Sequence, residues 1–268
     1  MAFFVNPEWQ PGSRAFEERA IEFTWYLGMA VQQRQRSIAS LHESIREQSP
    51  DATVLEVSTK STDQALGRSL SAFSLSLNGY PVENIFQSAK VMSDGGPHLD
   101  LLRVDPREAK RDCRIQTAES KADCATNGVK FTSAREFYDD ANDICPACRT
   151  RRQRRLSGFQ SKVFRWPLEP RSVFYDALYM TALVQPENRA LTEKIGGYSA
   201  FTDIAFNQKT PYASDAGPFN CQARSCAIYA TLASHGMEHD AIAELAAQPS
   251  EMLVLYDPGA QEPETLWQ

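Results

Sequence analysis

The 268-residue chain lacks the features that define several common classes of protein. No apolar run approaches the roughly 20 residues needed to cross a bilayer, so no transmembrane helix is expected. Lys and Arg number 28 against 34 Asp and Glu, and the net charge of −6 excludes a basic field over the whole protein. Gly-rich phosphate loops, an H-E-x-x-H zinc motif and a G-x-S-x-G nucleophile motif are absent. The remaining composition is that of an ordinary globular protein.

Cysteine is also too scarce for a disulfide scaffold, with six residues in the chain. Cys145 and Cys148 have the spacing of zinc ligands or of a redox pair, but no second ligand pair follows at a recognisable spacing. Free thiols are therefore favoured, and neither a metal nor a cofactor is expected. Only five apolar residues open the chain before Asn6, too few for a secretory signal, so we expect an intracellular protein, cytoplasmic or nuclear.

The hydrophobic periodicity predicts a mainly α fold of the α+β class, with a small sheet near the N-terminus. Alternating or continuous apolar residues predict strands at residues 21–25, 53–58 and 69–77. Helices are predicted from residue 30 to just before Pro50, from Pro81 to about Met92, from Pro106 onward, and at 172–185, 187–195, 220–235 and 238–247.

We expect one compact domain over residues 17–248, with an extended arm at 1–16 and a tail at 249–268. Residues 116–162 sustain no apolar period and predict a surface insertion in that domain. The insertion ends in a basic run, R-T-R-R-Q-R-R, at residues 149–155. This run suits contact with nucleic acid phosphates, although a solvated basic loop is the simpler interpretation.

The segment G-Y-P-V-E-N-I-F-Q-S-A-K contains the most informative pattern. On a helix that begins near Pro81, Glu83, Gln87 and Lys90 fall at i, i+4 and i+7 and share one face. An acid, an amide and an amine arranged in this way can form a polar wall of a pocket. Spacing alone favours the solvated side of a helix.

These residues belong to a longer pattern that resembles a known family. The run L-S-A-F-S at 70–74, followed by N-G-Y-P-V-E-N-I-F-Q-S-A-K at 78–90, resembles the signature of the NADAR (YbiA-like) family. The similarity continues at 105–114, at Trp166, and at 174–183, 201–207 and 220–225. The resemblance implies a compact, mainly helical YbiA-like domain that acts on ADP-ribose joined to a base through an N-glycosidic bond.

The resemblance also implies roles for individual residues. Glu83 would stabilise positive charge at the anomeric carbon or activate water, and Lys90 would hold an oxygen or form a Schiff base. Lys60, just after the second predicted strand, competes with Lys90 for this catalytic role. The substrate-binding residues would be Ser71, Phe73, Gln87, Lys110, Arg114, Trp166, Asp203, Asn220 and Gln222.

The leading hypothesis is a hydrolase that removes ADP-ribose from guanine in DNA, paired with a DarT-type ADP-ribosyltransferase. One alternative keeps the N-glycosidic bond and changes the substrate to a small phosphorylated metabolite, such as an intermediate of riboflavin synthesis. The other is a non-catalytic binder of ADP-ribose. ADP-ribose and ADP-ribosylated guanine in nucleic acid are therefore the expected partners, and no membrane partner is expected.

Overall fold

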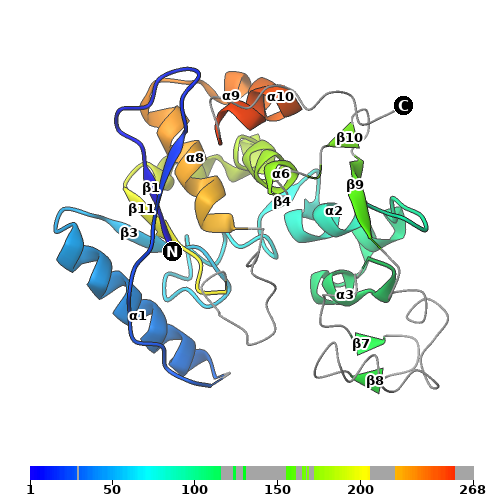
Figure 1. Ribbon diagram of the computed structural model, residues 1–268, viewed down its shortest axis with the longest axis horizontal. Helices are drawn as coiled ribbons and strands as arrows, with labels where there is room; N and C mark the ends of the chain where they lie inside the picture. The colour runs from blue at the N-terminus through cyan, green and yellow to red at the C-terminus, as the bar shows by residue number, and fades with distance from the viewer. Residues whose placement is uncertain are drawn as a thin grey trace. The chain divides into compact units, whose positions relative to one another are not determined.

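The computed structural model describes residues 1–28, 30–115, 155–160, 165–166, 168, 172–205 and 221–256, and the backbone of 123–124 and 129–130. The fold is α+β and mainly helical, as predicted (Figure 1). The chain divides into two compact units. Unit 1 takes the described residues of Met1–Leu77, Glu169–Gln208 and Pro218–Gln268, and unit 2 those of Asn78–Leu168 and Lys209–Gly217. The predicted insertion at 116–162 therefore falls within the range of unit 2, and the predicted domain boundaries stay predictions.

Unit 1 is built on a four-stranded sheet with the order β2-β1-β11-β3. Its strands are β1 (Ala2–Val5), β2 (Phe16–Arg19), β3 (Val54–Glu56) and β11 (Ala200–Thr202). β1 pairs antiparallel with β2 and β11, whereas β11 pairs parallel with β3. The parallel pair brings the carboxyl ends of β3 and β11 to the same edge of the sheet.

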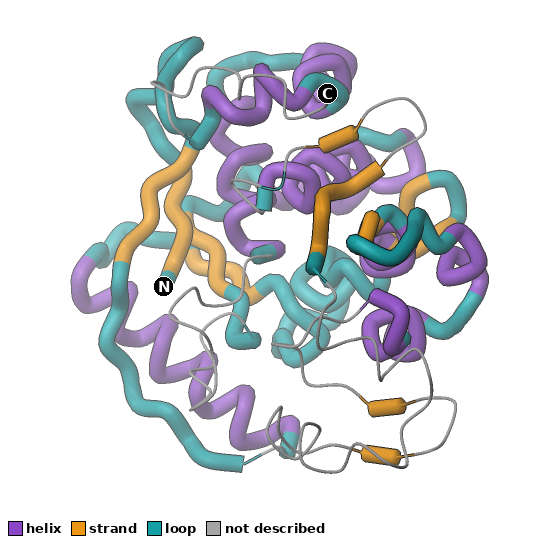
Figure 2. Tube along the Cα trace, turned by 45° about the vertical axis from the view of Figure 1, so that its right-hand side comes forward, coloured by secondary structure: helices purple, strands orange, loops and turns teal. Residues whose placement is uncertain are grey.

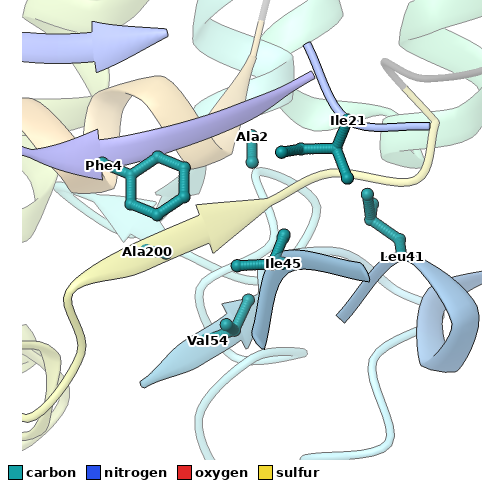
Figure 3. Packing of buried hydrophobic residues seen from close by; sticks show 7 residues of the cluster. All are labelled: Ala2, Phe4, Ile21, Leu41, Ile45, Val54 and Ala200. Atoms are coloured by element: carbon teal, nitrogen blue, oxygen red, sulfur yellow. The ribbon is translucent and has the colours of Figure 1, made fainter. Parts of the chain in front are cut away.

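The side chains of β1 alternate between the two faces of this sheet. On one face, Ala2 and Phe4 pack with Leu41 and Ile45 of α1 (Val31–Gln48) in an apolar cluster (Figure 3). Phe3 lies on the other side of the strand, and the guanidinium of Arg224, from helix α8 (Gln222–Ser234), lies 5.8 Å from the centre of its ring. Helices thus cover both faces, which explains why β1, β3 and β11 are mostly apolar, whereas the edge strand β2 carries Glu17, Glu18 and Arg19.

The remaining helices of unit 1 are α6 (Val173–Leu183), α7 (Arg189–Ile195), α8 (Gln222–Ser234), α9 (His239–Ala246) and α10 (Pro249–Val254), with a 3₁₀ turn η4 (Pro186–Asn188). A buried ion pair joins two of them. Arg224 Nε of α8 lies 2.8 Å from Asp176 Oδ2 of α6, and Ser225 Oγ also donates to Asp176. Burial raises the pKa of Asp176, while the nearby Arg224 acts to lower it.

Unit 2 contains the helices α2 (Val82–Ser88) and α3 (Pro106–Arg111), with the 3₁₀ turns η1 (Leu99–Arg103) and η2 (Cys113–Ile115). A three-stranded sheet has the order β10-β9-β6, formed by Arg165–Trp166, Leu156–Gln160 and Lys90–Met92. The shorter strands are β4 (Ser76–Leu77, at the end of the unit 1 segment), β5 (Tyr80–Pro81), β7 (Asp123–Cys124) and β8 (Val129–Lys130).

Most of the predicted helices are confirmed. The main errors concern strands. Residues 69–77 are turns except for Ser76–Leu77, because backbone bonds such as Leu75 N to Ser71 O close the chain locally. Residues 21–25 form no strand. Instead this segment runs back along α1 (Figure 2), with the amides of Thr24 and Tyr26 donating to Ser40 Oγ and Ser37 Oγ.

The two ends of the chain also differ from expectation. Residues 1–16 were expected to form an extended arm, but Ala2–Val5 is a central strand of the unit 1 sheet. The predicted tail contains α10, whose Met252 is fully buried. Both differences arise because the partners of these segments lie far away in the sequence.

Candidate active site

Helix α2 carries the first two residues of the predicted polar wall. It begins after Pro81, whose φ of −56° suits a helix start, and Glu83 lies in its first turn, where the helix dipole favours a carboxylate. The helix ends at Ser88, and Lys90 begins strand β6, where it pairs with Phe159 of β9. The prediction that Lys90 continues the helix was therefore wrong, and a strand, not a helical turn, sets its position.

The carboxyl group of Glu83 and the amide of Gln87 form a buried pair. Gln87 Nε2 donates to Glu83 Oε1 at 2.7 Å, and the two residues are 4% and 5% exposed, respectively. Because the carboxylate accepts, the amide nitrogen must face it, and this fixes the orientation of the Gln87 side chain. Gln87 Oε1 is then a buried acceptor with no donor among the described residues. Such an atom is costly unless a ligand or water supplies a hydrogen.

Two lysines complete this group in unit 2. Lys110 Nζ of α3 lies 3.7 Å from Glu83 Oε1. Asp105 is the N-cap of α3, and its side chain accepts a hydrogen bond from Arg107 N. Lys90 is half-buried as a whole residue, yet burial of its amine lowers its pKa to about 8, with Lys110 contributing and Glu83 opposing. At neutral pH about a tenth of such an amine is uncharged, which an amine nucleophile requires.

Two other predicted residues of unit 2 are less available to a substrate. Arg114 Nη2 lies 2.6 Å from Asp100 Oδ2 and 2.8 Å from Asp112 Oδ2, and these carboxylates raise the pKa of the guanidinium further. Trp166 lies in β10, is 4% exposed and pairs with Phe159. Its burial leaves little of the ring exposed for stacking on a base.

In unit 1, the structure links two of the predicted substrate residues. Gln222 Nε2 donates to Asp203 Oδ2 at 3.1 Å, and Gln222 Oε1 accepts from Ala72 N at 2.6 Å. The Gln222 amide therefore ties the turn at Ala72 to the loop after β11. The neighbours of Ala72 are Ser71, which is fully buried, and Phe73, which is half-buried.

Lys60 lies in the turn after β3 and is half-buried, with its backbone amide bound to Ser58 Oγ at 3.1 Å. Asn220 and the Cys145/Cys148 pair lie outside the described residues. Among the residues that the structure does describe, no group of three or more His, Cys, Asp or Glu is arranged to hold a metal. In the same ranges no helix has the length and apolar character to span a membrane.

Sequence reasoning missed Glu56. This last residue of β3 is 2% exposed, and burial, with nearby Asp203, raises its pKa to about 8. The available signal was a glutamate within the otherwise apolar strand T-V-L-E-V-S, because a lone acid in a buried strand calls for dedicated partners.

The mainly helical α+β fold, with a buried Glu-x₃-Gln pair on a short helix and a lysine three residues further on, defines the class as NADAR-like. The family model described as DarT1-associated NADAR antitoxin matches residues 3–140 and 142–257. The chain belongs to this family. Membership supports a role in reversing ADP-ribosylation and a pairing with a DarT-type ADP-ribosyltransferase. Among curated proteins, none matches the chain.

Proposed function

We propose that the protein hydrolyses the N-glycosidic bond between ADP-ribose and guanine in DNA. The observation that carries this proposal is the group in unit 2, where a buried carboxylate, an unsatisfied amide oxygen and two lysines lie on adjoining elements. Family membership supplies ADP-ribose as the substrate class.

Each step of the reaction requires a particular kind of side chain. Cleavage breaks the bond from the anomeric carbon to a guanine nitrogen, water supplies the new C–O bond, and a proton goes to the departing base. Glu83 is suited to stabilise the positive charge at the anomeric carbon or to take the proton from water. Gln87 Oε1 offers an acceptor to a ribose hydroxyl or a base N–H, and Lys110 offers charge to a phosphate.

The direct test uses a DNA oligonucleotide that carries ADP-ribosylated guanine, with products identified by mass spectrometry. Wild-type protein is expected to release ADP-ribose and leave intact DNA. Glu83→Gln should lose turnover by about 100-fold or more while it still binds ADP-ribose. The matched control is Glu108→Gln, an exposed glutamate of α3, which should behave as wild type.

Each other outcome changes the assignment. Equal release by wild type and Glu83→Gln would remove Glu83 from the mechanism. Release from a small ADP-ribosylated or phosphorylated metabolite but not from DNA would favour the metabolite glycosidase. Binding of ADP-ribose with no release from any substrate would leave a non-catalytic binder.

A second experiment tests the amine of Lys90 as a nucleophile. If it forms a Schiff base with the opened ribose, borohydride added during turnover should reduce the imine and leave a stable adduct on Lys90, located by peptide mass spectrometry. Lys90→Arg should abolish the adduct, whereas Lys110→Arg should retain it. An adduct on Lys60 instead would transfer the role to the loop after β3, and the absence of any adduct would favour direct attack by water.

A further inference from the structure

The carboxyl ends of the parallel strands β3 and β11 meet around one side chain, that of Glu56. Glu56 pairs in register with Thr202, and the strands continue to bond just beyond it, where Val57 N donates to Thr202 O at 2.8 Å. At this edge both strands turn into loops, and each loop contains a predicted site residue.

The carboxyl group of Glu56 binds both loops at once. Its Oε1 accepts from Ser58 Oγ at 2.6 Å, on the loop after β3, and from Ile204 N at 2.9 Å, on the loop after β11. Its Oε2 accepts from Thr202 Oγ1 at 2.7 Å. Three donors thus converge on one buried acid, which offsets part of the cost of its desolvation.

Each hydrogen bond to a loop leads directly to a candidate site residue, Lys60 for catalysis and Asp203 for substrate binding. Ser58 Oγ, which donates to Glu56, also accepts from the backbone amide of Lys60 at 3.1 Å. Ile204 immediately follows Asp203, whose carboxylate receives Gln222 Nε2 and Ala205 N. The backbone positions of Lys60 and Asp203 therefore depend on the same carboxyl group.

A third segment, at Gly67, also fixes the backbone position of Glu56. A side chain on Gly67 would collide with the carbonyl oxygen of Glu56 and with Ser61 Oγ, so only glycine permits this approach. The end of β3 is therefore held by close packing as well as by hydrogen bonds, and the acid has little freedom to point elsewhere.

We propose that Glu56 is a positioning residue of the substrate site, whose carboxyl group holds the Lys60 and Asp203 loops in one arrangement. This inference rests on the proposed function, because it takes Lys60 as a candidate catalytic residue and Asp203 as a candidate substrate-binding residue. An apolar side chain would fill the same space without the cost of a buried acid, but it would leave the two loops unconnected.

The test compares Glu56→Leu, which removes all three bonds, with Glu56→Gln, which keeps the shape and one carbonyl acceptor for the two loop donors. The affinity for ADP-ribose is measured by calorimetry, and KM and kcat on the ADP-ribosylated oligonucleotide are measured in parallel. Glu56→Leu should weaken ADP-ribose binding and raise KM by about tenfold or more, and Glu56→Gln should recover most of the loss.

Thr231→Val is the control for stability, because it removes the hydrogen bond that Asn6 N donates to Thr231 Oγ1 elsewhere in unit 1. It should lower the melting temperature and leave KM unchanged. A folded Glu56→Leu protein with wild-type affinity and KM would overturn the proposal. If Glu56→Leu does not fold, Ser58→Ala decides, because loss of the link to Lys60 should still raise KM, and an unchanged KM would count against positioning.

The two proposals fail separately. If wild-type protein binds ADP-ribose but releases none from DNA, the proposed reaction is wrong, and the calorimetric comparison still decides the role of Glu56. If wild-type protein does not bind ADP-ribose, both are wrong.

Discussion

The two units hold their buried carboxyl groups in different ways. Asp176 in unit 1 meets a guanidinium at 2.8 Å and a serine hydroxyl, and Glu56 in the same unit receives three hydrogen bonds. Glu83 in unit 2 meets one amide and a lysine at 3.7 Å, and the amide itself keeps an unsatisfied oxygen. The first arrangement is completed by the protein, so it supports the fold. The second lacks a donor for the amide oxygen among the described residues, and this is the pattern expected where a substrate binds.

The largest expected effect concerns the buried carboxyl groups of unit 1, whose hydrogen-bond partners are supplied by the protein. Asp176→Ala leaves the Arg224 charge buried without its carboxylate and should lower the free energy of unfolding by about 3–5 kcal/mol. Denaturant titration of the variant measures this change. Glu193→Ala removes the exposed ion pair with Arg189 and should leave stability nearly unchanged. Similar losses of stability in both variants would contradict the structural role assigned to the buried Asp176.

The next effect concerns the pH dependence of stability. Folded Glu56 keeps its proton to about pH 8 instead of 4.5, so the folded state binds more protons in this window and stability falls as pH rises through it. His42, which contacts Thr202 and whose pKa is lowered to about 4 by burial and then by Arg46, gives the opposite slope, but only below 6.5.

Between pH 6.5 and 8 the decline in stability should therefore come from Glu56, with a slope of at most about 1.4 kcal/mol per pH unit. Denaturant titrations at several pH values measure this slope, and Glu56→Gln should reduce it. An equal slope in the variant would show that another group titrates there.

A smaller effect tests the Glu83–Gln87 pair of unit 2, at which we propose that a substrate binds. Gln87→Met removes both the Oε1 acceptor and the Nε2 donor to the buried Glu83 carboxylate, so ADP-ribose affinity should fall by about tenfold or more and the free energy of unfolding by about 1–3 kcal/mol. Calorimetry and thermal melting measure the two quantities on the same samples. A loss of stability with unchanged affinity would make Gln87 a structural residue.

The smallest effect separates two cations of unit 2. Arg114 is already bound to Asp100 and Asp112, so Arg114→Ala should change ADP-ribose affinity by less than about threefold. Lys110→Ala should have a larger effect, because its amine lies 3.7 Å from Glu83 and its side chain is 55% exposed, so that a phosphate can reach it. The reverse order would assign the pyrophosphate to Arg114.

Sequence periodicity was sufficient where local pattern decides structure. Helix α1 and helix α6 follow their predicted ranges closely, because their apolar residues recur at helical spacing. The motif around Glu83 and Gln87 was likewise found from its i, i+4 spacing and the family resemblance.

The errors occur where residues that are distant in the sequence determine the local structure. Lys90 leaves the helix because β9, about 70 residues later, offers strand pairing. The sequence indicated that Glu56 needs dedicated partners but could not identify them, because Thr202 and Ile204, which bind it, lie 146 and 148 residues away. The alternation of Phe73, Leu75 and Leu77 indicated a strand, yet local turn bonds satisfy the backbone there instead.

The pairing of β11 with β1 and β3 has a consequence for the order of assembly. Strands made first, at Ala2–Val5 and Val54–Glu56, obtain their shared neighbour only when Ala200–Thr202 has been synthesised. At about 5–20 residues per second, the 146 residues between Glu56 and Thr202 take roughly 7–30 s to translate. A ribosome-bound chain therefore carries β1 and β3 without the strand that pairs with both for most of its synthesis. The hydrogen bonds from Thr202 and Ile204 to Glu56 form among the last steps.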